Sequence, residues 1–214
     1  MKLEEVLFEV TSNNLIQIRI GGNQMHIEQI YGDLPILKTD RLILRKITLE
    51  DLDDMFEYAS DEEVAQYVTW PAHKTISDTK NFIENILDKY QKKQIAPWGI
   101  ELKDNGKFVG TIGFISWQTK SNCAEIGYAL SKKYWGKGLV TEATKEIMTF
   151  GFNKMDLVRI QAKCISDNIA SSKVMKKNGM VLEGTMRQSF LCDKVYKDMD
   201  LYAILKEEYK LTKL

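Results

Sequence analysis

Two glycines mark the part of the sequence where residue types and spacing best fit a chemical task. Gly136 and Gly138 stand one residue apart, between a predicted strand that ends near Leu130 and a predicted helix that begins near Leu139. Without a side chain, glycine lets backbone N–H groups point toward a common centre, and a helix start adds a partial positive charge. The junction therefore predicts a cradle for an anion such as pyrophosphate.

A simpler interpretation is a glycine-containing turn that only caps the helix. The spacing excludes two better-known phosphate loops. A Walker loop has four residues between its glycines, and a dinucleotide fingerprint has a third glycine where this chain has Thr141. Because one helix-dipole contact contributes only about 0.3–1 kcal/mol at an exposed site, a cradle needs several converging donors.

The elements that must position this loop are predicted from periodicity and turn signals. Apolar alternation predicts strands, spacings of three and four predict helices, and Asn105-Gly106 predicts a tight hairpin. In chain order, we expect strands at 41–45, 98–102, 108–117, 124–130, 157–165, 181–191 and 195–205, and helices at about 48–56, 78–90 after a Ser77 cap, 139–154 and 170–178. This order predicts one α+β domain, a mixed sheet with helices on its faces.

Residues 1–33 differ from the rest and form a predicted N-terminal extension, followed by the domain at 34–214. Short strands are indicated at 6–8 and 15–20, before the breaker Gly21-Gly22. The extension could pair with a sheet edge or form a homodimer contact, and the sequence leaves both open.

The composition limits the classes of function. Thirty basic residues balance thirty acidic ones, so no general attraction to nucleic acid or to a membrane is expected. No apolar run approaches the roughly 18 residues of a membrane span, and Glu4 and Glu5 interrupt what would be a signal peptide, so we expect a cytoplasmic protein. The three cysteines and two histidines lack the spacing of a disulfide framework, a metal site or a Ser-His-Asp triad, and no metal is expected.

A second stretch, from Asn168 through Ser171 to Gly179, places the loop in a wider pattern. In chain order the pattern consists of Thr39-Asp40-Arg41-Leu42-Ile43-Leu44-Arg45, Trp70-Pro71, Glu125-Ile126-Gly127-Tyr128, Tyr134-Trp135-Gly136-Lys137-Gly138, the Asn168/Ser171 helix start, and Asp198 with Leu201-Tyr202. Together these segments resemble the GNAT superfamily of acetyl-CoA-dependent N-acetyltransferases, and most closely its RimJ/RimL-like branch, named for ribosomal-protein N-terminal acetyltransferases. The resemblance runs from about Leu37 to Tyr209. It implies the GNAT fold, a mostly antiparallel central sheet flanked by helices, with splayed central strands.

The resemblance implies acetyl-CoA as cosubstrate. Loop amides would hold its pyrophosphate, its pantetheine arm would lie between the splayed strands, and Asn168 would hold the pantetheine. The residues implied in cofactor binding are Leu130, Tyr134, Trp135, Gly136, Lys137, Gly138, Leu139, Val140, Asn168 and Ser171. Lys133 stands where the family usually has Gln or Arg, which changes a side chain more than the amide cradle.

The usual catalytic side chains of the family are replaced. Met175 stands at the place of a frequent tyrosine acid, Lys163 at the place of one glutamate base and Phe190 at that of another. The resemblance leaves Ser171 as an acid and Glu125 as a base that acts through water. Each has an alternative: Ser171 as a first-turn cap of its helix, and Glu125 as a sheet-face carboxylate paired with a lysine.

On the acceptor side, the resemblance implies a groove near Trp70, His73 and Tyr128 and direct transfer to a primary amine, either a protein N-terminal α-amine or a small-molecule amine. At pH 7 an α-amine costs only about 1–1.4 kcal/mol to deprotonate, whereas a lysine costs about 4.6 kcal/mol. Two rivals remain: a GNAT-like domain that binds acyl-CoA as a regulatory or structural ligand, and an interaction module that uses residues 1–33.

Overall fold

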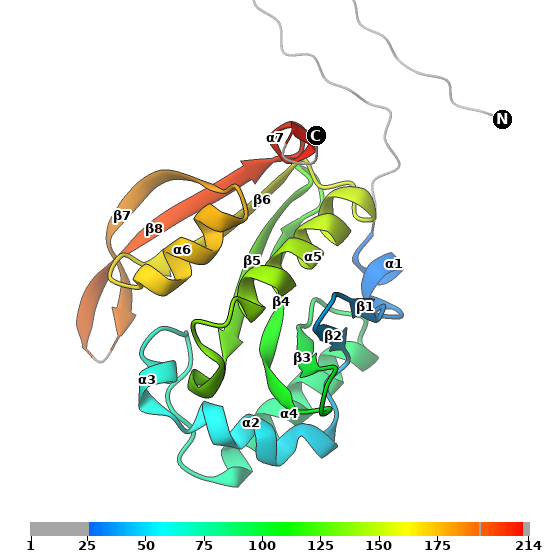
Figure 1. The fold of residues 1–214 in the computed structure, drawn as a ribbon, viewed down its shortest axis with the longest axis vertical. Helices are drawn as coiled ribbons and strands as arrows, with labels where there is room; N and C mark the ends of the chain where they lie inside the picture. Colours follow the sequence, from blue (N-terminus) through cyan, green and yellow to red (C-terminus); the bar gives the residue numbers. More distant parts are fainter. Residues whose placement is uncertain (1–25, 193, 212–214) are drawn as a thin grey trace, which may run out of the picture.

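The fold is seen in a computed structural model that describes residues 26–192 and 194–211. Figure 1 shows a single twisted sheet with helices packed against it. The strands expected at 6–8 and 15–20 lie outside the described residues. In the described part of the chain, no helix combines the length and the apolar character needed to cross a membrane.

Within residues 26–192 and 194–211, eight strands form one sheet in the order β1-β2-β3-β4-β5-β6-β8-β7. Their bounds are β1 Leu37–Lys38, β2 Leu42–Arg45, β3 Trp98–Leu102, β4 Phe108–Gln118, β5 Cys123–Leu130, β6 Arg159–Ile165, β7 Val181–Cys192 and β8 Val195–Leu205. All neighbours are antiparallel except β5 and β6, which are parallel. This arrangement confirms the expected α+β fold class with its mixed, mostly antiparallel sheet.

The two central strands separate part-way along their length. β5 and β6 are paired only up to Ile126 and Ala162. Beyond that point β5 continues to Leu130 beside β4, and β6 continues to Ile165 beside β8. The sheet therefore opens between β5 and β6, as the expected splay requires.

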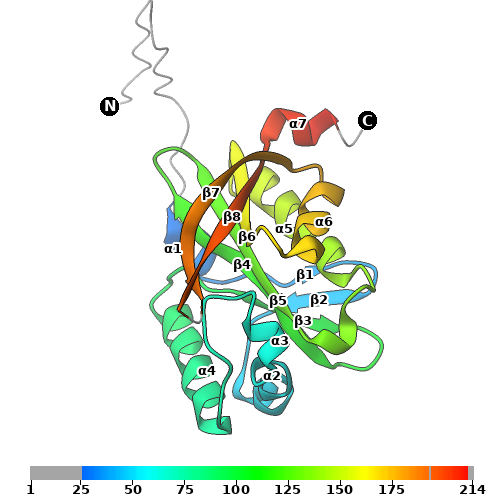
Figure 2. The ribbon, with the colours of Figure 1, turned by 90° about the vertical axis from the view of Figure 1, so that its left-hand side faces the viewer.

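Helices cover both faces of the sheet. Their bounds are α1 Ile27–Tyr31, η1 Leu49–Asp51, α2 Leu52–Ala59, α3 Glu62–Ala65, α4 Ile76–Gln91, η2 Lys132–Tyr134, α5 Leu139–Asn153, α6 Ile169–Lys177 and α7 Lys206–Leu211. Helices α5 and α6 lie on one face, and α2 and α4 lie on the other (Figure 2). Ala143 and Ile147 of α5 are buried in the larger core, whereas Met55 of α2 and Ile83 of α4 are buried in a second cluster.

Helix α4 begins two residues before the expected position. The sequence predicts Ser77 as the cap, but the structure places the cap at Thr75 and begins the helix at Ile76. Thr75 Oγ1 accepts a hydrogen bond from the Asp78 N–H, and the Asp78 carboxylate accepts one from the Thr75 N–H at 2.8 Å. Residues spaced this way form a capping box, which decides where the first turn begins.

Three short helices, α1, α3 and α7, were not expected from periodicity. Helix α1 lies inside the predicted N-terminal extension, yet its Tyr31 is buried with its ring centre 6.2 Å from that of Trp98. In α7, Tyr209 packs on Phe152 at 4.8 Å. One or two turns are too short for an apolar stripe to show. The domain boundary at residue 33 stays a prediction.

Gly110 lies at a tight contact between β4 and β5. A Cβ atom there would stand 2.2 Å from the Ala129 carbonyl oxygen, which cannot move without displacing β5. We expect Gly110→Ala to lower the free energy of unfolding by about 1–3 kcal/mol, measured by urea denaturation. Gly184→Ala is the matched control, because nothing in the described part of the chain lies within 4 Å of its Cβ position. An equal loss in both variants would contradict the argument.

Candidate functional site

The loop between β5 and α5 has the backbone geometry of an anion cradle. Gly136 and Gly138 adopt positive φ angles of 73° and 76°, which glycine takes without steric cost. Gly138 is the N-cap of α5, so the N–H groups of Leu139 and Val140 have no acceptor within the helix. Apart from its chain neighbours, no atom of the described residues lies within 4 Å of the position that a Gly136 Cβ would take. These features fit a pyrophosphate group.

Side chains of the loop make local contacts that fix its shape. Trp135 Nε1 donates a 2.8 Å hydrogen bond to the Leu130 carbonyl oxygen and so ties the loop to the end of β5. The Lys137 ammonium lies 4.8 Å from the centre of the Tyr134 ring. Leu130 at the end of β5 and residues 134–140, which run into the first turn of α5, thus lie together in the structure. Their contact with acetyl-CoA stays a prediction.

Lys133, the departure from the usual family residue, is turned toward α2. Its ammonium lies 2.8 Å from Glu57 Oε1, and the hydrogen bond from Lys133 lowers the pKa of Glu57. The neighbouring Lys132 pairs with Glu63 of α3. These contacts anchor η2 from the side, so the lysine at position 133 does not need to enter the cradle.

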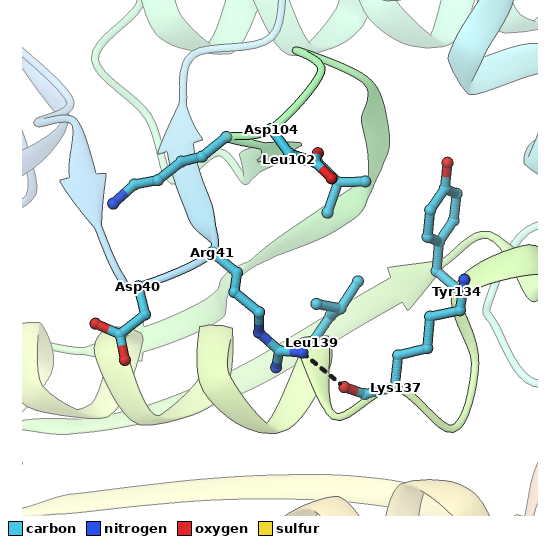
Figure 3. Close-up of a pocket in the computed structure, with 8 residues that line it drawn as sticks. Asp40, Arg41, Leu102, Asp104, Tyr134, Lys137 and Leu139 are labelled. Carbon is cyan, nitrogen blue, oxygen red and sulfur yellow. Dashed lines mark hydrogen bonds between the residues drawn. The ribbon is translucent and has the colours of Figure 1, made fainter.

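A hydrogen-bond network that was not predicted from the sequence connects the β5–α5 loop to the residues just before β2. Arg41 Nη1 donates a 3.0 Å hydrogen bond to the Lys137 carbonyl oxygen (Figure 3). Arg41 Nε also donates to Glu142 Oε2 at 2.6 Å, and Thr39 Oγ1 donates to Glu142 Oε1 at 2.5 Å. A pocket of about 440 Å³ lies beside these residues. The partners are 96 to 103 positions apart, so no local spacing could have revealed them.

Ser171 and Tyr128 meet across the opening of the sheet. Ser171 is buried in the first turn of α6, and Tyr128 lies on the part of β5 that has separated from β6. Their oxygens, Ser171 Oγ and Tyr128 Oη, share a 2.6 Å hydrogen bond. The cap of α6 is Asn168, whose Oδ1 accepts from the Ser171 N–H at 3.0 Å. The Ser171 hydroxyl is therefore directed to Tyr128, while the cap bond is made by Asn168.

This pairing gives Tyr128 a contact that was not expected, while its contact with an acceptor stays a prediction. The sequence places Tyr128 on the acceptor side, whereas in the structure its hydroxyl contacts the candidate acid Ser171. Burial raises the pKa of the Tyr128 phenol, so it stays protonated at neutral pH. Met175, which replaces the usual tyrosine acid, is buried. The Tyr128 hydroxyl thus reaches the start of α6 from strand β5, whereas the usual tyrosine of the family would lie on α6 itself, at position 175.

Glu125 lies on the opposite face of β5 from Tyr128, because side chains alternate along a strand. Its carboxylate accepts hydrogen bonds from Lys163 Nζ at 2.8 Å and Gln161 Nε2 at 2.9 Å. The Glu125 side chain is only 12% exposed. This is the geometry of a sheet-face carboxylate paired with a lysine, the alternative interpretation of Glu125. Its role as a base stays a prediction.

Trp70 and His73 lie together at the start of α4. Their ring centres are 5.2 Å apart, and both rings pack against Phe82. His73 Nδ1 shares a 2.8 Å hydrogen bond with Thr79 Oγ1. Burial lowers the pKa of His73, so the ring is neutral at pH 7. The two residues form one aromatic surface, and its contact with an acceptor stays a prediction.

Comparison with known proteins adds an independent line of support. Residues 41–181 match the family described as the acetyltransferase (GNAT) domain. The uncharacterized N-acetyltransferase YoaA of Bacillus subtilis (strain 168) is 36% identical over 172 residues, which cover 80% of this chain and 97% of that protein. The ribosomal-protein-serine acetyltransferase of Escherichia coli (strain K12) is 28% identical over 139 residues, 64% of this chain and 76% of that protein. A crystal structure of a GNAT-family acetyltransferase from Bacillus anthracis has a TM-score of 0.73 and 32% identity, covering 81% of this chain and 99% of that one.

The fold, the cradle and the family match define an acyltransferase, and the chain belongs to the GNAT acetyltransferase family. It is an acetyl-CoA-dependent N-acetyltransferase, and its relatives place it in the RimJ/RimL-like branch. These findings confirm the expected family, fold and reaction class. Nothing in them favours the rival in which the domain only binds acyl-CoA.

A bulky anion at Gly136 tests the cradle. We expect Gly136→Glu to abolish binding of CoA, measured by isothermal titration, because the new carboxylate fills and charges the open space beside the loop amides. Gly106→Glu is the control. Its φ of 69° imposes the same backbone strain, and none of the residues that the structure describes comes within 4 Å of its Cβ position, but it lies in the β3–β4 turn. Unchanged CoA affinity in Gly136→Glu would show that the cradle is misplaced.

Proposed function

We propose that the chain acetylates primary amines that are already substantially neutral near pH 8, and that peptide N-terminal α-amines are its acceptors. The observation that carries this proposal is the character of the groups at the sheet opening. Ser171 and Tyr128 are hydroxyls, which can give a proton to a leaving group. Glu125, the candidate base, is ion-paired with Lys163 on the other face of the strand.

In this proposal, residues at the starts of α5 and α6 bind different parts of acetyl-CoA. Acetyl-CoA supplies an activated thioester, with its pyrophosphate on the amides of residues 134–140 and its pantetheine near Leu130 and Asn168. The partial charges of the α5 start favour the anion. Holding both reactants in one orientation then provides most of the rate, so transfer needs no covalent enzyme intermediate.

Proton donation to the leaving thiolate is assigned to Ser171. Tyr128 is assigned the role of resupplying the proton to Ser171. A thiol with a pKa near 8.5 needs only modest acid assistance. Because burial raises the pKa of Tyr128, its phenol keeps the proton that it can pass to Ser171 through their 2.6 Å hydrogen bond. Two hydroxyls in series can thus replace the single tyrosine that other GNAT enzymes place at the position of Met175.

The ion pair between Glu125, the candidate base, and Lys163 sets a limit on the acceptor. At pH 7 a lysine amine costs about 4.6 kcal/mol to deprotonate, and an α-amine costs only about 1–1.4 kcal/mol. A weak base that works through water suffices for the α-amine and not for the lysine. The name of the E. coli relative, ribosomal-protein-serine acetyltransferase, supports an acceptor on a protein.

A matched pair of peptides tests the acceptor class. One peptide has a free N-terminus and no lysine, and the other has a blocked N-terminus and one lysine. We expect thiol release from acetyl-CoA only with the first, with kcat/KM rising with pH and levelling off above about 8 as the α-amine loses its proton. A faster reaction with the lysine peptide would contradict the α-amine assignment. Tight CoA binding with no release for any peptide or small amine would contradict the enzymatic function.

Removal of single hydroxyls tests the acid assignment. We expect Ser171→Ala and Tyr128→Phe each to lower kcat by about ten- to a hundredfold, measured by thiol release at saturating acetyl-CoA. Ser172→Ala is the matched control, since the neighbouring Ser172 hydroxyl donates to the Ile169 carbonyl oxygen and faces its own helix turn. A kcat for Ser171→Ala equal to that of the control would rule out the acid role.

A further inference from the structure

The loop between β5 and α5, which forms the proposed pyrophosphate cradle, makes a hydrogen bond on its β2 side that the proposed function has not used. The Lys137 carbonyl oxygen accepts a 3.0 Å hydrogen bond from Arg41 Nη1 (Figure 3). The geometry points to Arg41 as a positioning residue that sets the direction of the Gly138 N–H toward the CoA pyrophosphate. This inference rests on the proposed cradle and adds the part that orients it.

The argument begins with the planarity of the peptide bond. In a trans peptide, the carbonyl of one residue and the N–H of the next point in opposite directions. The Lys137 carbonyl points to Arg41, so the Gly138 N–H points away from Arg41. A glycine at φ 76° has a low barrier to rotating away from this arrangement. The hydrogen bond from Arg41 removes that freedom.

Arg41 is itself held in place by the first turn of α5. Its Nε and Nη2 both lie 2.6 Å from Glu142 Oε2, and its backbone N–H donates to Glu142 Oε1 at 2.9 Å. Thr39 Oγ1 donates to the same carboxylate. Burial alone would raise the pKa of Glu142, but the hydrogen bonds from Thr39 and Arg41 lower it. One carboxylate therefore fixes the guanidinium, and the guanidinium fixes the loop.

The Arg41–Glu142 ion pair also removes an unfavourable charge from the cradle. Glu142 lies in the first turn of the helix whose start is expected to bind a pyrophosphate. An uncompensated carboxylate there would repel the anion. Arg41 neutralises this charge and uses a third N–H for the Lys137 carbonyl, which a lysine cannot do because it has no rigid fork of donors.

Arg41→Lys keeps the charge and removes the fork. We expect the Kd of CoA, measured by isothermal titration, to rise about tenfold or more, as for loss of a hydrogen bond from a charged group. The kcat/KM for acetyl-CoA should fall by the same factor, whereas the kcat/KM for S-acetylpantetheine, which has no pyrophosphate, should not change. General damage to the fold would lower both values together and would overturn the inference.

Arg45→Lys is the control for stability. Arg45 lies at the other end of β2 and also combines a backbone carbonyl, that of Lys46, with carboxylate partners, Asp51 and Glu101. This variant should lower the melting temperature without changing the Kd of CoA. Wild-type protein that fails to bind CoA would overturn the proposed function itself. Wild-type protein that binds CoA, with equal affinity in Arg41→Lys, would overturn only the role of Arg41.

Two further variants test whether the charge of Glu142 affects CoA binding apart from the hydrogen bond of Arg41 to the loop. Arg41→Ala leaves Glu142 uncompensated, and Arg41→Ala/Glu142→Gln removes that charge while the amide oxygen can still accept from Thr39. We expect the double variant to bind CoA more tightly than Arg41→Ala. An equal or weaker affinity would show that an uncompensated Glu142 carboxylate does not weaken CoA binding.

Discussion

The site depends on the parting of β5 and β6. Two parallel strands that stay paired would close the sheet, but here the ladder stops at Ile126 and Ala162. Each strand keeps its other neighbour, β4 for β5 and β8 for β6, so neither loses its support. Backbone groups that leave a ladder need other partners. Trp135 supplies one by donating to the Leu130 carbonyl oxygen, and this bond also ties the β5–α5 loop to the end of β5.

Two helices begin at this opening and bring different chemistry to it. The α5 start, with positive-φ glycines, offers backbone donors, whereas the α6 start offers the buried Ser171 hydroxyl. Tyr128 links the second helix to the separated strand, and Arg41 links the first helix to β2. The net charge of zero is consistent with this design, because a highly charged cosubstrate can be held by local amides without a positive surface.

The regular elements could be predicted because their signals are local. The β3–β4 hairpin follows from alternation on both sides of Asn105-Gly106, and α5 begins where Gly138 ends the loop. The contacts within the site could not be predicted in this way. Tyr128 and Ser171 are 43 positions apart, and Arg41 and Glu142 are 101 apart. Only the completed sheet decides which face of β5 carries Tyr128 and which carries Glu125.

The direction in which side chains point from each strand also bears on two of the three catalytic positions at which the chain differs from its family, 175 and 163. Met175 of α6 is buried and carries no hydroxyl, whereas the Tyr128 hydroxyl of β5 contacts Ser171 in the first turn of the same helix. A lysine at position 163 removes a carboxylate from β6, and instead of acting as a base it pairs with Glu125. In the proposed mechanism, Ser171 and Tyr128 thus carry the acid function, and the base function is weak. An enzyme built in this way depends on its acceptor for basicity, so the pKa of the amine, more than the shape of a base pocket, would decide which substrates react.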